Sequence, residues 1–393
     1  RIEVVHPEIG NLTMLRALNL SGNPIDMLPI DIGYATNLTS IELDFDRLKI
    51  PAPAVCALGQ DAVMAWFKSL CSMRLTRDGD LNARDIDHLP IEVCFVTSLT
   101  KLDVANNDIS YLHPEVSSLV GLTEFYAHNN CLAFLPDTIH SLSNVVNINL
   151  DNNDLVRLPD EFGGMVSLTH ISVRNNKLKA LPPTIGNCRE VITFFANQNQ
   201  LSTLPFSFGE MVKLRELRLH YNKLSSVPWT LKQLTAVTVL HMQNNEFELF
   251  PEPVCHMSSV SHANFANNMI RLIPFEVGNM SLLTSLDLAA NPGLRELPLY
   301  LGDITQLKIL TIECAAIKMP APEILCKGIP CVMEHLRTLS LALVEHKLDF
   351  SSYGLRKLPL EVRDLPELRD LNLDYNYISE FSEELLNDLN RYV

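Results

Sequence analysis

The most constraining feature of this 393-residue sequence is a pattern that recurs every 23 residues. Counted from Leu99, the pattern reads L-x-x-L-x-L-x-x-N-x-L-x-x-L-P-x-x-I-G, and most of the chain follows it. Self-similarity at such a period predicts an array of like units that must stack, because one unit cannot bury its own apolar face. The sequence therefore predicts a repeat protein whose function depends on what its faces display.

Each unit begins with a short alternation of apolar and polar residues. With the first leucine as position 1, positions 4 and 6 are apolar, as in Leu102 and Val104 or Leu217 and Leu219. This period of two predicts a strand with one buried face. Because the units stack in order, we expect the strands to form a parallel sheet.

Position 9 is asparagine in eleven of the fifteen units. An inward amide at this position can satisfy backbone groups of its own turn and of the neighbouring turn. We therefore predict a buried asparagine ladder along the stack. Its central members are Asn107, Asn130, Asn153, Asn176, Asn199, Asn222, Asn245, Asn268 and Asn291. The four units without this asparagine, at Asp46, Arg84, Ala315 and Tyr353, all flank irregular stretches.

Two similar insertions of 15 residues interrupt the repeat. Both contain K-x-P-A-P, then a glycine, then apolar residues at helical spacing, as in Val63, Phe67 and Leu70. In each insertion we predict a longer helix on the convex side that covers a discontinuity in the stack, with a docking site for a partner as the alternative. Residues 38–99 match 307–368, which indicates a duplicated ancestral unit.

These breaks predict five segments. They are N-terminal repeats of an array truncated at its start (1–50), a first helical island (51–75), a central array (76–319), a second helical island (320–344) and C-terminal repeats (345–393).

The 23-residue unit with its L-P-x-x-I-G segment, as in Leu181, Pro182, Ile185 and Gly186, resembles the Ras-group-related class of intracellular leucine-rich repeat proteins. This class includes scaffolds of the Sur-8/Shoc-2 type. The resemblance covers nearly the whole chain. It implies an α/β solenoid, or horseshoe, with a parallel concave β-sheet, and a non-catalytic binding surface. Implied partners are proteins such as a small GTPase, a phosphatase or the subunits of an assembly.

Composition restricts the partners and the compartment. A formal net charge of −15 disfavours nucleic acid and anionic lipid, which bind basic surfaces. No apolar run approaches the length of a membrane span. Nine cysteines without a C-x-x-C pair or a cysteine-rich cap indicate reduced thiols and a cytoplasmic location. Glycosylation sequons at Asn11, Asn19, Asn37 and Asn279 favour the alternative of a secreted protein.

The sequence contains no motif for catalysis or cofactor binding. It has no phosphate-binding glycine loop with its lysine, no G-x-S-x-G, no H-E-x-x-H and no kinase signature. His220, His241 and His262 recur at about the repeat spacing but lack the paired cysteines or carboxylates of a metal site. We therefore expect no enzyme activity, no cofactor and no metal site.

Positions 3, 5, 7 and 8 of each unit are expected to project from the concave sheet. In the central units these positions are rich in aromatic residues, arginine and histidine, whereas acidic residues occupy them toward both ends. Aromatic residues and arginine most often anchor protein interfaces. The predicted partner site comprises Tyr126, His128, His170, Arg174, Phe195, Arg218, His220, Tyr221 and His241.

The sequence thus predicts a non-enzymatic scaffold or adaptor that binds proteins through its concave face. Two roles fit this prediction: intracellular signalling, or a structural subunit of a larger assembly such as a cytoskeletal or ciliary one. An alternative is the sensor region of a larger protein of the GTPase or kinase type. A receptor ectodomain is a further alternative.

Overall fold

The computed structural model describes residues 1–359, 361–362 and 365–380. The chain divides into two compact units, Arg1–Val191 and Ile192–Val393, which are described separately. The predicted C-terminal repeats, 345–393, include residues 360, 363–364 and 381–393, which lie outside the described residues.

The first unit consists of short strands that alternate with 3-10 turns. Its strands are β1 (Ala17–Asn19), β2 (Ser40–Glu42), β3 (Asp78–Asp80), β4 (Lys101–Asp103), β5 (Glu124–Tyr126), β6 (Asn147–Asn149) and β7 (His170–Ser172). Its 3-10 turns are η1 (Pro7–Asn11), η2 (Ile30–Tyr34), η3 (Phe45–Arg47), η4 (Pro114–Ser118), η5 (Asp137–Ser141), η6 (Asp160–Gly164) and η7 (Ile185–Asn187). Its α-helices are α1 (Pro53–Ala57), α2 (Gln60–Thr76) and α3 (Ile91–Cys94).

The second unit repeats this arrangement. Its strands are β8 (Thr193–Phe195), β9 (Glu216–Arg218), β10 (Val239–His241), β11 (His262–Asn264), β12 (Ser285–Asp287), β13 (Ile309–Thr311), β14 (Lys347–Asp349) and β15 (Asp370–Asn372). Its 3-10 turns are η8 (Phe206–Glu210), η9 (Trp229–Gln233), η10 (Phe275–Asn279) and η11 (Leu299–Asp303). Its α-helices are α4 (Glu252–Cys255), α5 (Pro322–Leu325) and α6 (Ile329–Glu345).

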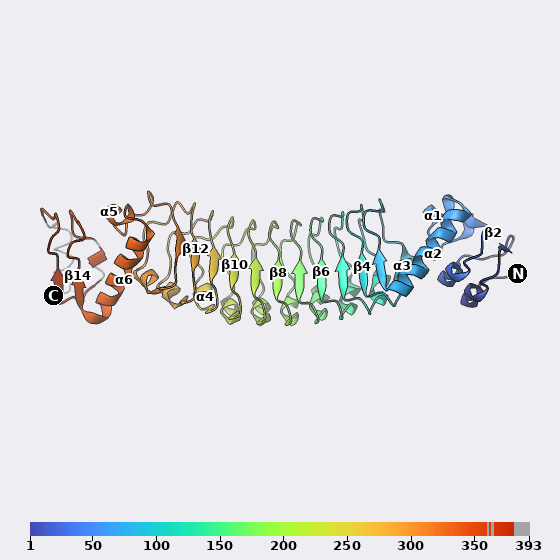
Figure 1. Ribbon diagram of the computed structural model, residues 1–393, viewed down its shortest axis with the longest axis horizontal. Coiled ribbons are helices and arrows are strands. Elements are labelled where there is room, and N and C mark those ends of the chain that lie inside the picture. Colours follow the sequence, from blue (N-terminus) through green and yellow to red (C-terminus); the bar gives the residue numbers. More distant parts are fainter. Residues whose placement is uncertain (360, 363–364, 381–393) are drawn as a thin grey trace. The chain divides into compact units, whose positions relative to one another are not determined.

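The strands are parallel and in register, as the repeat predicts. Position 4 of each strand faces the core, so Leu102, Phe125 and Ile148 lie beside one another on β4, β5 and β6. Figure 1 shows the strands of each unit side by side, with the 3-10 turns gathered along one side. Most turns start directly after a proline such as Pro136, whose fixed φ suits the start of a helical turn.

The predicted buried asparagine ladder is confirmed. The Asn153 side-chain amide donates to the carbonyl oxygens of Ala127 and Leu150 at 2.9 and 3.0 Å. Its Oδ1 accepts from the Leu132 backbone N–H at 3.0 Å. The same pattern recurs at neighbouring units, for example at Asn245 in the second unit. Each asparagine therefore bonds its own turn to the preceding one.

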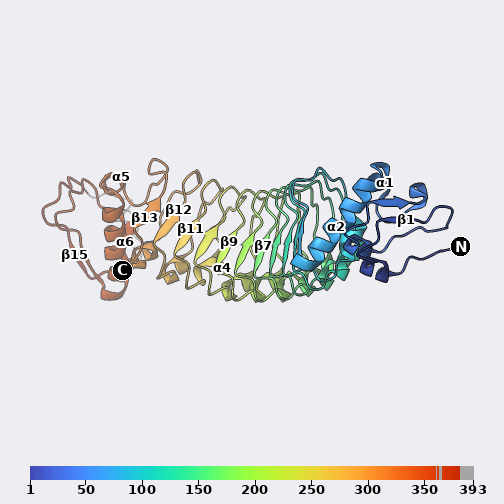
Figure 2. The same ribbon diagram turned by 45° about the vertical axis from the view of Figure 1, so that its right-hand side comes forward.

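The two predicted island helices are α2, which packs against η2, and α6, which packs against η11. Glycine permits this close approach. A Cβ at Gly33 of η2 would lie 2.4 Å from the Phe67 carbonyl oxygen, and one at Gly302 of η11 would lie 2.2 Å from the Arg337 backbone nitrogen. The turned view in Figure 2 shows α2 against the first repeats.

Each island also interrupts the sheet. In the first unit β1 pairs with β2 and a separate sheet begins at β3, while in the second unit a sheet ends at β13 and β14 pairs with β15. Figure 1 shows α2 between β2 and α3, and α6 beside β14. The prediction that the helices cover a discontinuity in the stack is therefore confirmed.

Candidate partner-binding face

Positions 3 and 5 of each strand point away from the core on one face, here called the strand face. In the second unit, Phe195 on β8 lies opposite Arg218 on β9, which lies opposite His241 on β10. The parallel register therefore places these three predicted site residues in one row. All three side chains are partly exposed.

The Arg218 guanidinium is fixed by its neighbours. Its Nε donates to Glu216 Oε1 at 2.6 Å, and its Cζ lies 4.6 Å from the centre of the Phe195 ring. A cation above an aromatic face is attracted by the ring quadrupole. Because two contacts hold the side chain, little rotamer freedom remains to be lost when a partner binds.

His241 and His220 extend this row toward the turn. Their rings lie 6.0 Å apart, and the His220 ring also makes an edge contact with Tyr221 at 5.7 Å. Burial lowers the pKa of His241, and the positive charge of Arg218 lowers it further, whereas Glu216 opposes the shift. The imidazole is therefore neutral at physiological pH, so this part of the face is aromatic rather than cationic.

Tyr221 has an unusual backbone conformation. Its φ is 55°, in the left-handed region that bulky residues rarely adopt. Residues at the same position of other repeats include Asn129, Asn152 and Asn244, with similar φ values. Asparagine tolerates this conformation well, whereas the Tyr221 side chain is 54% exposed. Gln198, Ala290 and Tyr375 occupy the same position with φ between 52° and 57°, so the conformation belongs to the repeat, and Tyr221 adds an exposed aromatic side chain at this position.

The structure refines the predicted placement of positions 7 and 8. The strands end at position 5, so His128, Arg174 and His220 at position 7 lie in the turn that follows, and Tyr221 at position 8 lies beyond them. These residues border the strand face rather than projecting from its strands. The His220 ring at position 7 lies 6.0 Å from the His241 ring at position 5, so His220 adjoins the strand face.

In the first unit the predicted residues have separate partners. Tyr126 donates its hydroxyl hydrogen to Glu124 at 3.0 Å, and burial, followed by Glu124, raises the pKa of Tyr126 to about 12. His170 is exposed and lies next to Thr169, with 2.7 Å between its Nδ1 and Thr169 Oγ1. In contrast, His128 Nδ1 is buried without a hydrogen-bond partner among the described residues.

Sequence reasoning missed the role of Asp151. Its carboxylate is buried, with 2% of the residue exposed, and accepts hydrogen bonds from the Arg174 Nε at 2.8 Å and from Ser172 Oγ at 2.6 Å. Arg174 therefore neutralises a buried charge and is committed to the fold. The available signal was an aspartate at position 7 followed by an arginine at position 7 of the next repeat.

A second, exposed asparagine ladder runs beside the buried one in the first unit. Its amides bond from one repeat to the next, with Asn129 donating to Asn106 at 2.7 Å and Asn175 donating to Asn152 at 2.8 Å. These residues share the left-handed turn position of Tyr221. The exposed ladder of the first unit therefore lies at the repeat position that Tyr221 occupies in the second unit.

The described residues include no cluster of three or more side chains suited to a metal ion. Among the same residues, no helix is both long and apolar enough to cross a membrane.

Comparison with known proteins places the fold. Neither protein-family models nor curated proteins give a match. Among solved structures, the plant peptide hormone receptor RGFR1 in complex with RGF2 is 21% identical, with a TM-score of 0.54, over 98% of this chain and 55% of the receptor. The leucine-rich repeat domain of APL1B is 19% identical, with a TM-score of 0.54, over 81% of both chains.

These likenesses concern the fold alone, and this chain spans only about half of the receptor chain that it matches. Together with the in-register parallel strands, the recurring 3-10 turns and the buried asparagine ladder, they define the class. The chain therefore has the solenoid fold of leucine-rich repeat proteins.

Proposed function

We propose that this chain is a non-enzymatic scaffold or adaptor that binds a partner protein through the strand face of its second unit. The observation that carries the proposal is the group formed by Phe195, Arg218, His220, Tyr221 and His241. Aromatic residues and arginine dominate the binding energy of protein interfaces, and a preorganised arginine adds specificity for a carboxylate.

The proposed partner is a protein that presents a carboxylate and an apolar side chain. Arg218 keeps donors beyond those used by Glu216, because a guanidinium has five N–H groups. A small GTPase, a phosphatase or a subunit of a cytoskeletal or ciliary assembly is the partner class we propose. The resemblance to intracellular scaffolds of the Ras-group-related class supports this choice.

The proposed location is the cytoplasm. All nine cysteines are free, and five of them are buried. Burial raises the pKa of Cys94, Cys188 and Cys255 to about 12, so these thiols are unreactive core groups. Unpaired buried thiols suit a reducing compartment.

Crosslinking followed by mutagenesis tests the proposal. A photoreactive group at position 221 should capture a partner, whose affinity for the wild type is then measured with purified proteins. Replacing Phe195, Arg218 and Tyr221 together by alanine should weaken that affinity by about tenfold or more, since each is an interface anchor. The melting temperature should change little, because all three side chains are partly exposed.

Phe206→Ser provides the matched control. Phe206 is a large exposed side chain at the start of η8, so it belongs to a 3-10 turn and not to the strand face. The control should bind the captured partner as the wild type does. Unchanged affinity in the triple variant, or equal loss in the control, would reject the strand face as the binding site.

A further inference from the structure

The strand β14 has one unpaired edge. On its other edge, the His346 carbonyl oxygen accepts from the Asp370 N–H at 3.2 Å, and the Phe350 N–H donates to Asn372 at 2.8 Å. Backbone groups alternate in direction along a strand, so the N–H and C=O groups of Lys347 and Asp349 face away from β15. Within the described part of the chain, β14 pairs with no other strand.

In a regular repeat the corresponding groups are paired. On β5 the Glu124 N–H donates to Thr100 at 3.1 Å, and the Tyr126 carbonyl oxygen accepts from Val104 at 2.8 Å. The preceding strand, β13, does not pair with β14 among the described residues, because the second island intervenes. Two N–H donors and two carbonyl acceptors are therefore presented at the spacing of a β-strand.

The first island shows how such an edge is capped. There β3 follows α2 as β14 follows α6, and the Thr76 hydroxyl accepts from the Asp78 N–H at 3.3 Å while it donates its own hydrogen to the Ser72 carbonyl oxygen at 3.0 Å. Glu345 holds the place of Thr76 in the second island. Among the described residues, its carboxylate accepts no hydrogen bond from the Lys347 N–H, which is the group that corresponds to the Asp78 N–H.

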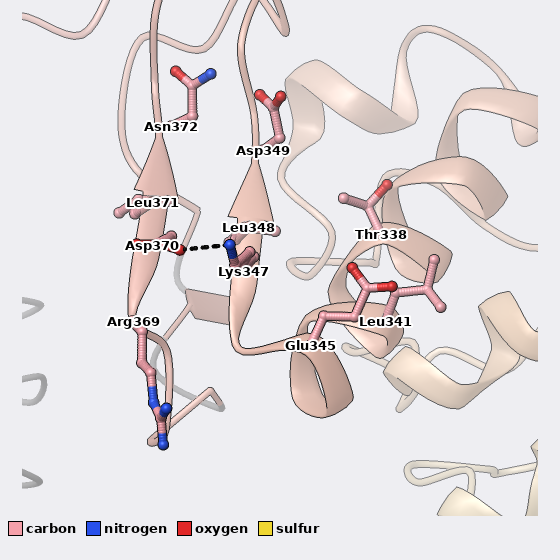
Figure 3. A pocket seen from close by; sticks show the side chains of 10 residues that line it. All are labelled: Thr338, Leu341, Glu345, Lys347, Leu348, Asp349, Arg369, Asp370, Leu371 and Asn372. Carbon is pink, nitrogen blue, oxygen red and sulfur yellow. Dashed lines mark ion pairs between the residues drawn. The ribbon is translucent and has the colours of Figure 1, made fainter.

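A groove lies along the open edge. It has a volume of about 730 Å³ and is lined by Thr338, Leu341 and Glu345 of α6 and by β14 and β15. Figure 3 shows β14 between β15 and this helix, with the open edge toward Leu341, whose surface is 47% exposed. The groove thus offers one apolar contact beside a row of backbone groups.

The charge of the groove is acidic where the edge is open. Lys347 is paired with Asp370 at 3.1 Å, so this lysine is not available to Glu345 or Asp349. The remaining lining cation, Arg369, extends away from both carboxylates in Figure 3. A basic side chain would complement Glu345 and Asp349.

We propose that the open edge of β14 binds an extended peptide of a partner protein by strand addition, with backbone pairing to Lys347 and Asp349 and a lysine or arginine near Glu345. Strand addition derives its affinity from main-chain hydrogen bonds and its specificity from alternate side chains. The Leu341 surface receives an apolar residue of the peptide. This site is independent of the strand face proposed above.

Displayed random heptapeptides with a fixed central lysine are the probe. They are selected on the full chain and then measured as synthetic peptides. Glu345→Thr installs the cap of the first island and should weaken binding about tenfold or more, since the hydroxyl occupies the Lys347 N–H that the peptide needs and the charge near the peptide lysine is lost. Glu345→Gln, the matched control, removes the same charge but supplies no hydroxyl cap, so it should weaken binding less than Glu345→Thr does.

Backbone pairing has its own signature. Bound peptide should slow hydrogen exchange at the amides of Lys347 and Asp349, and proline at the pairing positions of the peptide should abolish binding. The proposal is overturned if no peptide is enriched, if both Glu345 variants bind equally, or if the two amides exchange at unchanged rates.

Discussion

Asparagine has two different tasks at adjacent positions of the same repeat. Asn153 is buried and bonds to backbone groups of two turns, whereas Asn152 is exposed and donates its amide to Asn129 at 2.6 Å. The buried amide replaces hydrogen bonds that water cannot supply, but the exposed amide competes with water. Their contributions to stability should therefore differ greatly.

Asn153→Ala should lower the free energy of unfolding by about 2 to 4 kcal/mol, because the Leu132 N–H and the Ala127 carbonyl lose a buried partner. Asn152→Gly keeps the left-handed turn accessible and should lower the free energy of unfolding by less than about 1 kcal/mol. Urea denaturation followed by circular dichroism measures both values. Similar losses in the two variants would contradict the distinction between the ladders.

Tyr221 should lower the stability of the fold and strengthen the binding of the partner. Tyr221→Asn places at φ 55° the residue that other repeats use there, so the free energy of unfolding should rise by about 0.5 to 1 kcal/mol. The same change removes an exposed aromatic anchor and should weaken the affinity for the captured partner. Thermal denaturation and a binding titration on one preparation check both effects. A less stable variant would show that the tyrosine is not strained.

His241 should make stability fall in mildly acidic solution. Burial and Arg218 lower its pKa in the folded state, so below about pH 6.5 the unfolded chain takes up a proton that the folded chain resists. Stability contributed by the neutral imidazole is thus present above this pH and is lost as the pH falls toward the folded pKa. In His241→Gln the urea midpoint of unfolding should vary less with pH between pH 7.5 and 5.5 than it does in the wild type. The same pH dependence in both proteins would exclude this role of His241.

Among the elements, the islands are the most distinctive. In both copies a 17-residue helix follows a glycine with φ near 90° and ends at a residue in the left-handed region, Arg77 or His346. Both copies also place a glycine of the preceding 3-10 turn against the helix backbone. Backbone contact at this distance leaves no space for a side chain.

Gly302→Ala should therefore destabilise the second island by about 1 to 3 kcal/mol, since the new methyl group meets the Arg337 backbone. Gly293→Ala is the matched control, because its methyl group would meet the flexible Arg271 side chain, which can move. Calorimetry compares the two variants. Equal melting temperatures for Gly302→Ala and the wild type would show that the helix can shift at little cost.

The sequence predicted those elements that depend on residue period. The strands, the ladder at Asn153 and the island helices follow from the spacing of apolar residues and asparagines. This spacing is regular because units can stack only when their buried residues recur at the same positions. The pairings of Arg174 with Asp151 and of Arg218 with Glu216 did not follow, because they depend on rotamers and on the turn after each strand. The candidate site was thus predicted as a set of residues but not as a set of contacts.

At the scale of the whole molecule, the two islands share one backbone arrangement but differ in sequence. In each, a short α-helix and a 17-residue α-helix lie between two strands, yet Trp66 of α2 is replaced by His335 in α6. His335 is fully buried, stacks on Phe350 with ring centres 5.0 Å apart, and lies 3.7 Å from Glu361. The shared backbone plan therefore carries different chemistry in each copy.

The interrupted sheets have a mechanical consequence. In the part of the chain that the structure describes, no strand pairing joins β2 to β3 or β13 to β14, so no backbone ladder transmits load across either island. Under tension applied to the two termini, these junctions are the weak links, and each should yield as its own event before the laddered repeats unravel. Optical-tweezers traces would reveal such early, short extensions, and a single cooperative rupture would show that helix packing bears the load instead.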